Sequence, residues 1–417
     1  MLTISKSNTE IKGEITLEGS KSISNRVLII KALCDNRFEI SNLAKAKDTQ
    51  TLELLLQQPH ATYNTGHAGT TYRFLTAFLA LKNGEQLLTG SERMKQRPIG
   101  ALVDALRELG ANIDYVDKEG YPPLRIGTPS LQKKKTTLSI PAHVSSQFVS
   151  ALLLIAPYLP GGIQLRLEGK VVSRPYIEMT LSVMRSFGAQ CRWRDNIITI
   201  AERPYQAKDF IVEADWSAAS YFYEMAALSS NSQLQLNGVF ENSIQGDQVI
   251  ADLMEPFGVL TKYNRTGVLL TKNMRIGNMF EQDFIECPDI AQTMMATCAG
   301  TGQFGVFRGL DTLAIKETDR IVAMKTELNK LGVALTQLPA SWELIPGQVA
   351  YSCKGLAKRG LDTTIFETYK DHRMAMALAP LCLTVGMVKV IHPEVVQKSY
   401  PSFWEDLESI GFEVSRA

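Results

Sequence analysis

The stretch RELGANI, residues 107–113, joins the end of an amphipathic segment to an apolar run through a glycine. The same arrangement recurs in RSFGAQC (185–191), EPFGVLT (255–261), NKLGVAL (329–335) and ESIGFEV (408–414), at intervals of roughly 75 residues. Glycine readily adopts the left-handed conformation that ends a helix before a strand. The sequence therefore predicts a repeated unit in which an outer helix ends at a glycine and a strand follows.

A second series of segments recurs along the chain at a similar spacing to the first. Six apolar stretches, each opening on a capping or small polar residue, are SISNRVLIIKAL (22–33), TTYRFLTAFLAL (70–81), SSQFVSALLLIAPYL (145–159), WSAASYFYEMAAL (216–228), DIAQTMMATCA (289–299) and DHRMAMALAPLCL (371–383). Such segments are typical of buried helices, and alternating runs such as QLLTG and VKVIHP indicate strands. The first interval is the shortest, so the first of six units is expected to be shortened. The alternative is a coincidence between unrelated α/β segments.

The composition sets further bounds. A chain of 417 residues exceeds the usual size of one hydrophobic core, which favours two domains or a repeat architecture. A net charge of +1 is not that of a nucleic-acid binder. Six scattered cysteines and five histidines without a metal-ligand spacing predict neither disulfides nor a metal site. The N-terminus carries no signal pattern and the longest apolar stretch is too short to span a bilayer, so we expect a cytoplasmic protein without a membrane partner.

Basic residues occur where the pattern predicts helix starts. They are Lys21, Lys47, Arg97, Arg174, Lys316, Arg373 and Lys398. A helix N-terminus presents unpaired N–H groups and the positive end of the helix dipole, so a cation there is unfavourable unless an anion is bound. Taken singly, each is more simply a solvated surface charge. Their recurrence across units predicts one shared cleft for phosphates and carboxylates.

The motif GSKSISNR (19–26) superficially resembles a phosphate-binding P-loop, but it lacks the GxxxxGK[ST] spacing and a magnesium carboxylate, which argues against a nucleotide kinase. The ordered motifs GSKSISNR, HAGTTYR, ERMKQRPIG, VSSQF, VSRPYIEMT, PDIAQT, IKETDR, DHRMAMA and KSYPSFWEDL, taken together, resemble the 5-enolpyruvylshikimate-3-phosphate synthase family along essentially the full chain. That resemblance implies transfer of the enolpyruvyl group of phosphoenolpyruvate to the 5-hydroxyl of shikimate 3-phosphate, with release of phosphate, in aromatic amino-acid biosynthesis. It implies no cofactor.

The resemblance also implies a fold. We expect an α/β protein, a two-lobed inside-out α/β barrel built from six βαβαββ-type repeats with helices inside and sheets outside. The first lobe would span residues 19–213, with its first repeat shortened. The second lobe would combine residues 1–18 with residues 214–417. The substrates would bind between the lobes of a monomer.

Site residues follow from the resemblance, position by position. Phosphoenolpyruvate is expected to meet Lys21, Gly69, Arg97, Gln147, Arg320, Arg373 and Lys398. Shikimate 3-phosphate is expected to meet Lys21, Ser22, Arg26, Ser145, Ser146, Gln147, Ser173, Tyr176, Asp289 and Lys316. A simple turn is the alternative for the glycine, and helix capping is the alternative for the adjacent serine pair.

The expected chemistry needs a base for the attacking hydroxyl and an acid for the acceptor's methylene carbon. Asp289 is the expected base, although a helix N-cap is an equally good explanation of the residue. Glu317, with Lys21 and His372, is the expected proton relay to the methylene carbon.

Two substitutions depart from the family pattern: His67 stands where asparagine is usual, and Thr312 replaces an asparagine before IKETDR. A UDP-N-acetylglucosamine enolpyruvyl transferase is one alternative, but the loop GSERMKQRP (90–98) lacks the cysteine typical of that family. A catalytically silent repeat scaffold that only binds anions is the other alternative. The combined presence of Asp289, Glu317, Lys21 and His372 argues against it.

Overall fold

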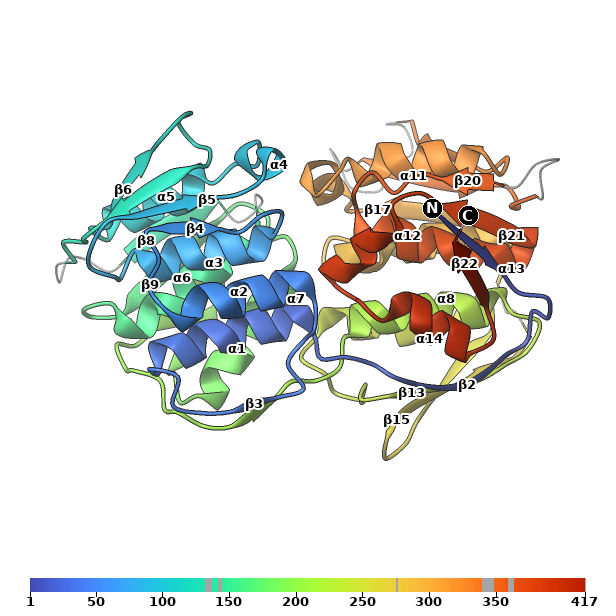
Figure 1. Ribbon diagram of the computed structural model, residues 1–417, viewed down its shortest axis with the longest axis horizontal. Helices are drawn as coiled ribbons and strands as arrows, with labels where there is room; N and C mark the ends of the chain where they lie inside the picture. Colours follow the sequence, from blue (N-terminus) through green and yellow to red (C-terminus); the bar gives the residue numbers. More distant parts are fainter. Residues whose placement is uncertain (132–136, 142–144, 275–276, 340–348, 359–363, 417) are drawn as a thin grey trace. The chain divides into compact units, whose positions relative to one another are not determined.

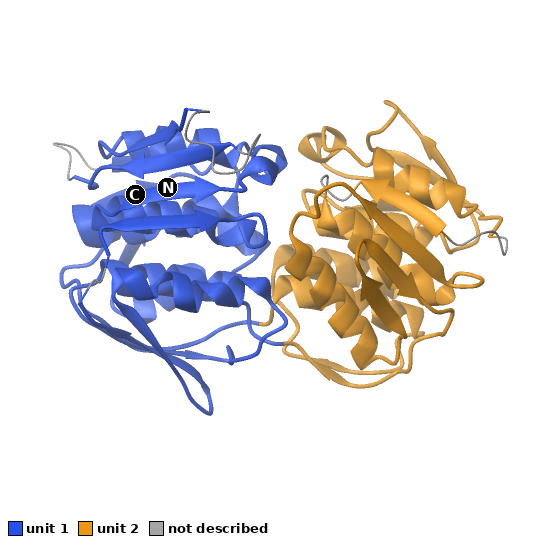
Figure 2. Cartoon of the chain, turned by 180° about the vertical axis from the view of Figure 1, so that it is seen from behind, with its two compact units in different colours: residues 1–18, 213–417 blue, residues 19–212 orange. Residues whose placement is uncertain are grey.

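The structure, a computed structural model, describes residues 1–131, 137–141, 145–274, 277–339, 349–358 and 364–416. The chain forms two compact units of mixed α/β structure (Figure 2). Unit 1 consists of Met1–Glu18 and Glu213–Ala417, and unit 2 is Gly19–Val212. In the described parts of the chain, no helix has both the length and the apolar character needed to cross a membrane.

Unit 2 contains two four-stranded sheets and one two-stranded sheet in its described residues. The first has the order β4 (Thr62–Asn64), β5 (Gln86–Thr89), β7 (Leu124–Gly127), β6 (Asn112–Tyr115). The second has the order β10 (Cys191–Arg194), β11 (Ile197–Ile200), β9 (Ile163–Glu168), β8 (Thr137–Pro141). The short pair is β3 (Ile40–Ser41) and β12 (Phe210–Ile211).

Unit 1 contains three four-stranded sheets in its described residues. The first has the order β14 (Val259–Tyr263), β15 (Gly267–Lys272), β13 (Ser232–Asn237), β2 (Ile11–Thr16). The second has the order β16 (Met279–Asp283), β17 (Phe304–Arg308), β19 (Ala350–Lys354), β18 (Ala334–Gln337). The third has the order β20 (Thr364–Phe366), β21 (Met387–Val390), β1 (Leu2–Ser5), β22 (Glu413–Arg416). Because β1 lies between β21 and β22, the first residues of the chain belong to the unit formed by the last.

All five four-stranded sheets share one pairing pattern. In each, one outer pair is parallel and the next two pairs are antiparallel. The short pair β3–β12 is also parallel, and no further strand joins it among the described residues. The strands alternate: in β9, Ile163, Leu165 and Leu167 are buried while the residues between them are exposed.

Each unit has a core of nearly fully buried helices. In unit 2, α3 (Gly69–Leu79) packs against α1 (Lys21–Leu33) and α6 (Ser146–Ile155) (Figure 1). In unit 1, α8 (Trp216–Leu228), α10 (Ala291–Thr301) and α12 (His372–Leu378) contact one another. The remaining α-helices are α2 (Lys47–Gln57), α4 (Glu92–Lys95), α5 (Gly100–Glu108), α7 (Arg174–Ser186), α9 (Ile250–Leu253), α11 (Arg320–Asn329), α13 (Cys382–Val385) and α14 (Phe403–Ser409). The short 3-10 turns are η1 (Ala156–Tyr158), η2 (Gly246–Val249), η3 (Glu255–Phe257), η4 (Pro288–Ile290), η5 (Asp311–Ile315), η7 (Ala379–Leu381) and η8 (Pro393–Lys398).

The glycines that end the amphipathic segments behave as expected. Gly110, Gly188, Gly258, Gly332 and Gly411 all have φ between 76° and 96°, and each lies between a helical turn and a strand. A side chain would be strained in that conformation, which explains why glycine marks the same point in successive segments.

The expectation that basic residues open helices holds only in part. Helices α1, α2 and α7 begin at Lys21, Lys47 and Arg174, as expected. The expectation is wrong for Arg97, Lys316 and Lys398. These residues come before α5, α11 and α14, and they stand at the C-terminal ends of α4, η5 and η8, respectively. A cation at the C-terminal end of a helical turn is electrostatically favourable, so these three positions do not by themselves require a bound anion.

Candidate active site

Arg320 is the centre of the charged cluster in unit 1. Its buried guanidinium pairs with three carboxylates: Nε with Asp371 Oδ2 at 2.8 Å, Nη1 with Asp289 Oδ1 at 3.3 Å and Nη2 with Glu317 Oε2 at 3.1 Å. Burial by itself lowers the pKa of Arg320, but the three carboxylates more than compensate, and its pKa lies above the ordinary value. An anionic ligand that binds Arg320 would therefore compete with these three carboxylates for the guanidinium group.

Asp289 lies in η4, directly before α10. The helix begins at Ala291 with Ile290 as its N-cap, so the alternative that Asp289 is the N-cap of this helix is wrong. Its carboxylate instead joins two arginines, through Oδ1 to Arg320 and through Oδ2 to Arg373 Nη2 at 2.9 Å. The side chain is 19% exposed, so it remains accessible to a substrate hydroxyl.

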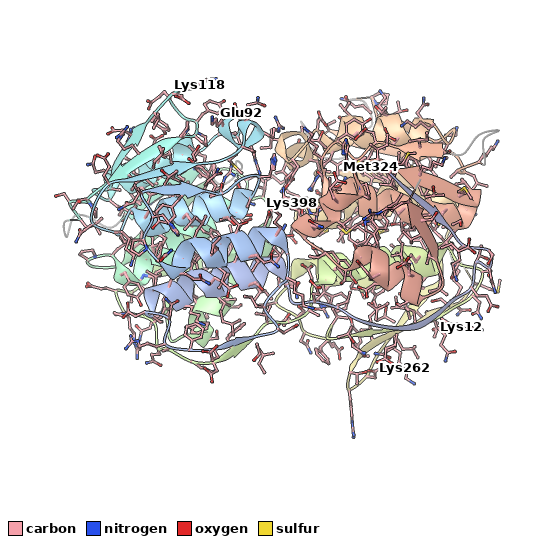
Figure 3. The ribbon with its side chains drawn as sticks, viewed as in Figure 1. Lys12, Glu92, Lys118, Lys262, Met324 and Lys398 are labelled. Carbon is pink, nitrogen blue, oxygen red and sulfur yellow. The ribbon has the colours of Figure 1, made fainter. Side chains whose placement is uncertain are left out.

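Glu317 and His372 complete the cluster. Lys398, which ends η8 and is labelled in Figure 3, places Nζ 2.5 Å from Glu317 Oε1. His372 is the first residue of α12 and is buried, with Nδ1 3.6 Å from Asp371 Oδ1. Glu317 thus contacts two cations that the resemblance assigns to phosphoenolpyruvate, Lys398 and Arg320. Lys316, expected at shikimate 3-phosphate, is half-buried at the C-cap of η5.

Arg373 has two neighbours that the motifs did not indicate. Its Nη1 donates a hydrogen bond to the buried phenol oxygen of Tyr221 at 3.3 Å. Burial raises the pKa of Asp247 to about 7, and the charge of Asp289 adds to this while Arg373 opposes it. No sequence motif marks Tyr221 or Asp247, because both residues are far from Arg373 in the sequence.

Helix α1 carries two of the cationic site residues of unit 2, Lys21 and Arg26. Lys21 Nζ lies 3.6 Å from Asp48 Oδ2 on α2. Arg26 is one turn further along α1, and its Nη1 donates to the Ser22 carbonyl at 2.6 Å. Its Nη2 also donates to the backbone carbonyl of Tyr176 on α7 at 3.1 Å. Unit 2 therefore brings together four residues expected at shikimate 3-phosphate.

Gly69 begins α3 beside the guanidinium of Arg97. A Cβ at this glycine would lie 2.4 Å from Arg97 Nη1 and 3.1 Å from Arg73 Nη1, so a side chain here would displace the end of the Arg97 guanidinium. This explains Gly69 better than a simple turn does, because its φ is not in the left-handed region. His67, just before it, has Nδ1 2.9 Å from Ser91 Oγ.

The serine pair is divided between two roles. Ser145 is the N-cap of α6 and accepts from the Gln147 backbone N–H at 3.2 Å, as the capping alternative predicted for one serine. Ser146 is the first helical residue. The Gln147 side chain donates to Thr70 Oγ1 at 3.2 Å, which links the starts of α6 and α3.

Ser173 has an unusual backbone for a residue other than glycine. It is buried, it precedes α7, and its φ of 53° and ψ of 41° lie in the left-handed region. Such strain is concentrated at functional positions. The conformation places Ser173 next to the α7 turn that carries Tyr176.

Each expected site residue lies in one of the two units. Unit 1 holds Asp289, Lys316, Glu317, Arg320, His372, Arg373 and Lys398. Unit 2 holds Lys21, Ser22, Arg26, Gly69, Arg97, Ser145, Ser146, Gln147, Ser173 and Tyr176. The motifs did not identify Asp48, Tyr221, Asp247 and Asp371 as partners, although Asp371 opens the DHRM motif and caps α12.

The comparisons with known proteins agree with one another. The family model described as EPSP synthase (3-phosphoshikimate 1-carboxyvinyltransferase) matches residues 5–62 and 52–407. A curated protein named 3-phosphoshikimate 1-carboxyvinyltransferase from Bacteroides fragilis (strain YCH46) is 46% identical over 405 residues, covering 97% of this chain and 96% of the relative. A protein of the same name from Sulfurovum sp. (strain NBC37-1) is 35% identical over 430 residues, covering 96% and 97%.

A solved structure supports the fold. An EPSP synthase from Acinetobacter baumannii superposes with a TM-score of 0.76 at 21% sequence identity, covering 100% of this chain and 99% of the other. The family model and the curated relatives each extend over nearly the whole chain, and the motifs that carry the resemblance lie in that span. The chain belongs to the EPSP synthase (3-phosphoshikimate 1-carboxyvinyltransferase) family.

Proposed function

We infer that the chain transfers the enolpyruvyl group of phosphoenolpyruvate to the 5-hydroxyl of shikimate 3-phosphate and releases phosphate. The observation that carries this conclusion is the match to the family model and to curated relatives over nearly the full chain. The reaction belongs to the shikimate pathway of aromatic amino-acid biosynthesis. The comparisons do not favour the UDP-N-acetylglucosamine enzyme or the silent scaffold.

We propose that the two substrates divide the site residues in the way that the resemblance implies. We propose that phosphoenolpyruvate binds Lys21, Gly69, Arg97, Gln147, Arg320, Arg373 and Lys398. We propose that shikimate 3-phosphate binds Lys21, Ser22, Arg26, Ser145, Ser146, Gln147, Ser173, Tyr176, Asp289 and Lys316. The guanidinium groups suit the carboxylate and phosphate of the small trianion, and the hydroxyls suit a polyol.

The proposed chemistry is addition followed by elimination. In the addition, Asp289 accepts the proton of the 5-hydroxyl group of shikimate 3-phosphate. The oxygen of that hydroxyl group then bonds to C2 of phosphoenolpyruvate, and an acid protonates the methylene carbon. In the elimination, the methyl group returns a proton and the C–O bond to phosphate breaks. Glu317 is the proposed acid and base at that carbon, with Lys21 and His372. Its contacts with Lys398 and Arg320, both proposed to bind phosphoenolpyruvate, support a position beside that substrate.

The architecture belongs to the proposal as well. We propose that the chain is a two-lobed inside-out barrel of six repeats, that the lobes are the two units, and that substrates bind between them. The repeated sheet pattern and the incomplete pair β3–β12 support six repeats with a shortened first member. The monomeric state and the cytoplasmic location stay predictions.

One assay tests the function. Phosphate release from phosphoenolpyruvate is measured with the full chain in the presence of shikimate 3-phosphate, of UDP-N-acetylglucosamine, or of neither. We expect release only with shikimate 3-phosphate. No turnover with that pair, or equal turnover with the UDP-sugar, would contradict the assignment.

A further inference from the structure

Arg26 is a buried cation whose partners are all neutral. It is 3% exposed, and burial lowers its pKa to about 10, with a smaller opposing effect from Tyr176. Within the described part of the chain, Arg26 forms no ion pair with a carboxylate. A desolvated guanidinium without a counter-ion is costly, so a structure that keeps one must hold it by other means.

Two hydroxyl groups hold this guanidinium. Arg26 Nε donates to Thr180 Oγ1 at 2.7 Å, and Nη2 donates to Ser150 Oγ at 3.2 Å. The two oxygens are themselves 2.8 Å apart and hydrogen-bonded, and both side chains are 0% exposed. Nε and Nη2 are the two nitrogens with which an arginine side chain commonly meets the two oxygens of a carboxylate.

The protons of this cluster can be assigned without conflict. Thr180 Oγ1 lies 2.9 Å from the Tyr176 carbonyl, which has no proton and must accept. Ser150 then donates to Thr180, and both hydroxyl oxygens keep a lone pair for Arg26. Every polar atom in the ring of three side chains is satisfied.

We propose that Ser150 and Thr180 are positioning residues that substitute for a carboxylate: they fix the orientation of the Arg26 guanidinium while leaving its positive charge uncancelled for shikimate 3-phosphate. Arg320 shows the contrasting arrangement, because its three carboxylates hold it and also neutralise it. A neutral pair of oxygens gives the same geometry at full charge. The inference rests on the proposed function, which places shikimate 3-phosphate at Arg26.

Thr180→Val is the main test because it replaces one hydroxyl by a methyl group at nearly constant volume. Loss of a hydrogen bond to a charged group corresponds to roughly a ten- to hundredfold change in affinity. We expect the KM for shikimate 3-phosphate to rise at least about tenfold, with the KM for phosphoenolpyruvate and kcat within about threefold of wild type. Ser150→Ala should have the same selective effect, and Thr180→Ser should retain wild-type values because it keeps the hydroxyl.

Thr76→Val is the matched control. Thr76 is also a fully buried threonine in a helix of unit 2, and its hydroxyl also donates to a carbonyl one turn earlier, at 2.8 Å. It is not among the hydrogen-bond partners of Arg26 in the described structure. Any loss that comes only from placing valine in a buried helix should appear in both variants, and circular dichroism with thermal unfolding identifies a variant that fails to fold.

The outcomes separate this inference from the proposed function. If wild type does not turn over shikimate 3-phosphate, the proposed function fails. If wild type is active and Thr180→Val and Ser150→Ala both fold with an unchanged KM for shikimate 3-phosphate, the positioning role is overturned. Equal losses for both substrates, or no recovery in Thr180→Ser, would also overturn it, because they indicate a general structural effect. Should Thr180→Val fail to fold, Ser150→Ala carries the same test.

Discussion

Asp289 forms ion pairs with the two arginines that the proposed mechanism assigns to phosphoenolpyruvate. The carboxylate and phosphate of that substrate compete with Asp289 for the same guanidinium groups. Substrate binding should therefore loosen the ion pairs of Asp289 and leave its carboxylate ready to accept the proton of the 5-hydroxyl.

Asp289→Asn keeps the shape of the side chain but removes the proton acceptor. We expect kcat to fall by roughly 10²–10⁴-fold, the usual contribution of general acid–base catalysis, while shikimate 3-phosphate still binds. Rapid-quench or steady-state phosphate release measures the first quantity, and calorimetry measures the second. The exposed Asp252 on α9 supplies the control substitution Asp252→Asn. An Asp289→Asn variant with full activity would exclude this residue as the base.

Tyr221 orients the other side of the same cluster. Burial raises the pKa of Tyr221 to about 12, and Arg373 opposes that shift, so the phenol keeps its proton at neutral pH. Tyr221→Phe removes only the oxygen that accepts from Arg373 Nη1. We expect the KM for phosphoenolpyruvate to rise about three- to tenfold with little change for shikimate 3-phosphate. Tyr223→Phe, on the same helix with its hydroxyl 3.0 Å from Thr261 Oγ1, is the control and should leave both constants unchanged.

The motifs predicted the side chains of the site better than their partners. Lys21 and Arg26 lie in one short motif and could be found by inspection. Their partners Asp48 and Thr180 could not, because the contacts join helices far apart in sequence and require the tertiary fold. Asp289 could be interpreted as a base, as a helix N-cap or as both. The position of η4 excludes the N-cap of α10, and the role as base stays a prediction.

At the scale of elements, the buried helices were predictable, but several helix starts were not. The six apolar segments all contain a buried helix, because nearly uniform apolarity indicates burial whatever the local caps. The expected helix start at Arg97 failed because a separate short helix, α4, precedes it. Such a four-residue turn has no periodicity that a sequence pattern can reveal.

Helix α8 carries a buried acid that should make stability depend on pH. Glu224 is 0% exposed, neither carboxyl oxygen has a hydrogen-bond partner among the residues that the structure describes, and burial raises its pKa well above the ordinary value. The folded chain keeps the proton and the unfolded chain loses it above about pH 4.5. Unfolding then releases a proton, so stability falls as pH rises from that value, by at most about 1.4 kcal/mol per pH unit from this group, until the folded pKa is reached.

Glu224→Gln removes this proton release without a large change of volume. The variant should be more stable than wild type at pH 8, and the difference should shrink toward pH 4. Urea unfolding followed by circular dichroism across this range measures it. Glu408→Gln, on an exposed position of α14, should show no such trend. A wild-type advantage at pH 8 would mean that Glu224 is ionised in the folded chain and has a partner.

At the scale of the whole molecule, the basic residues expected at the site are divided between the two units of a chain whose net charge is only +1. The recurring glycines predicted the repeat because each of them allows the left-handed backbone conformation at the same point, between a helical turn and a strand. The pairing of β1 between β21 and β22 could not be read from those glycines, since it joins the two ends of the chain. Long-range pairing of this kind is set by the tertiary fold rather than by local pattern.

The proposed ligands of phosphoenolpyruvate come from both units, with Lys21 and Arg97 in unit 2 and Arg320 and Lys398 in unit 1. Charges act strongly only where water is excluded, so catalysis should require the units to close on the substrates. We expect the radius of gyration from small-angle scattering to fall when shikimate 3-phosphate and phosphoenolpyruvate are both added to Asp289→Asn, the variant in which turnover is expected to be slow. Phosphoenolpyruvate with a UDP-sugar is the control and should leave the scattering unchanged. Identical curves with and without the substrate pair would show that the ligands from the two units do not converge by closure.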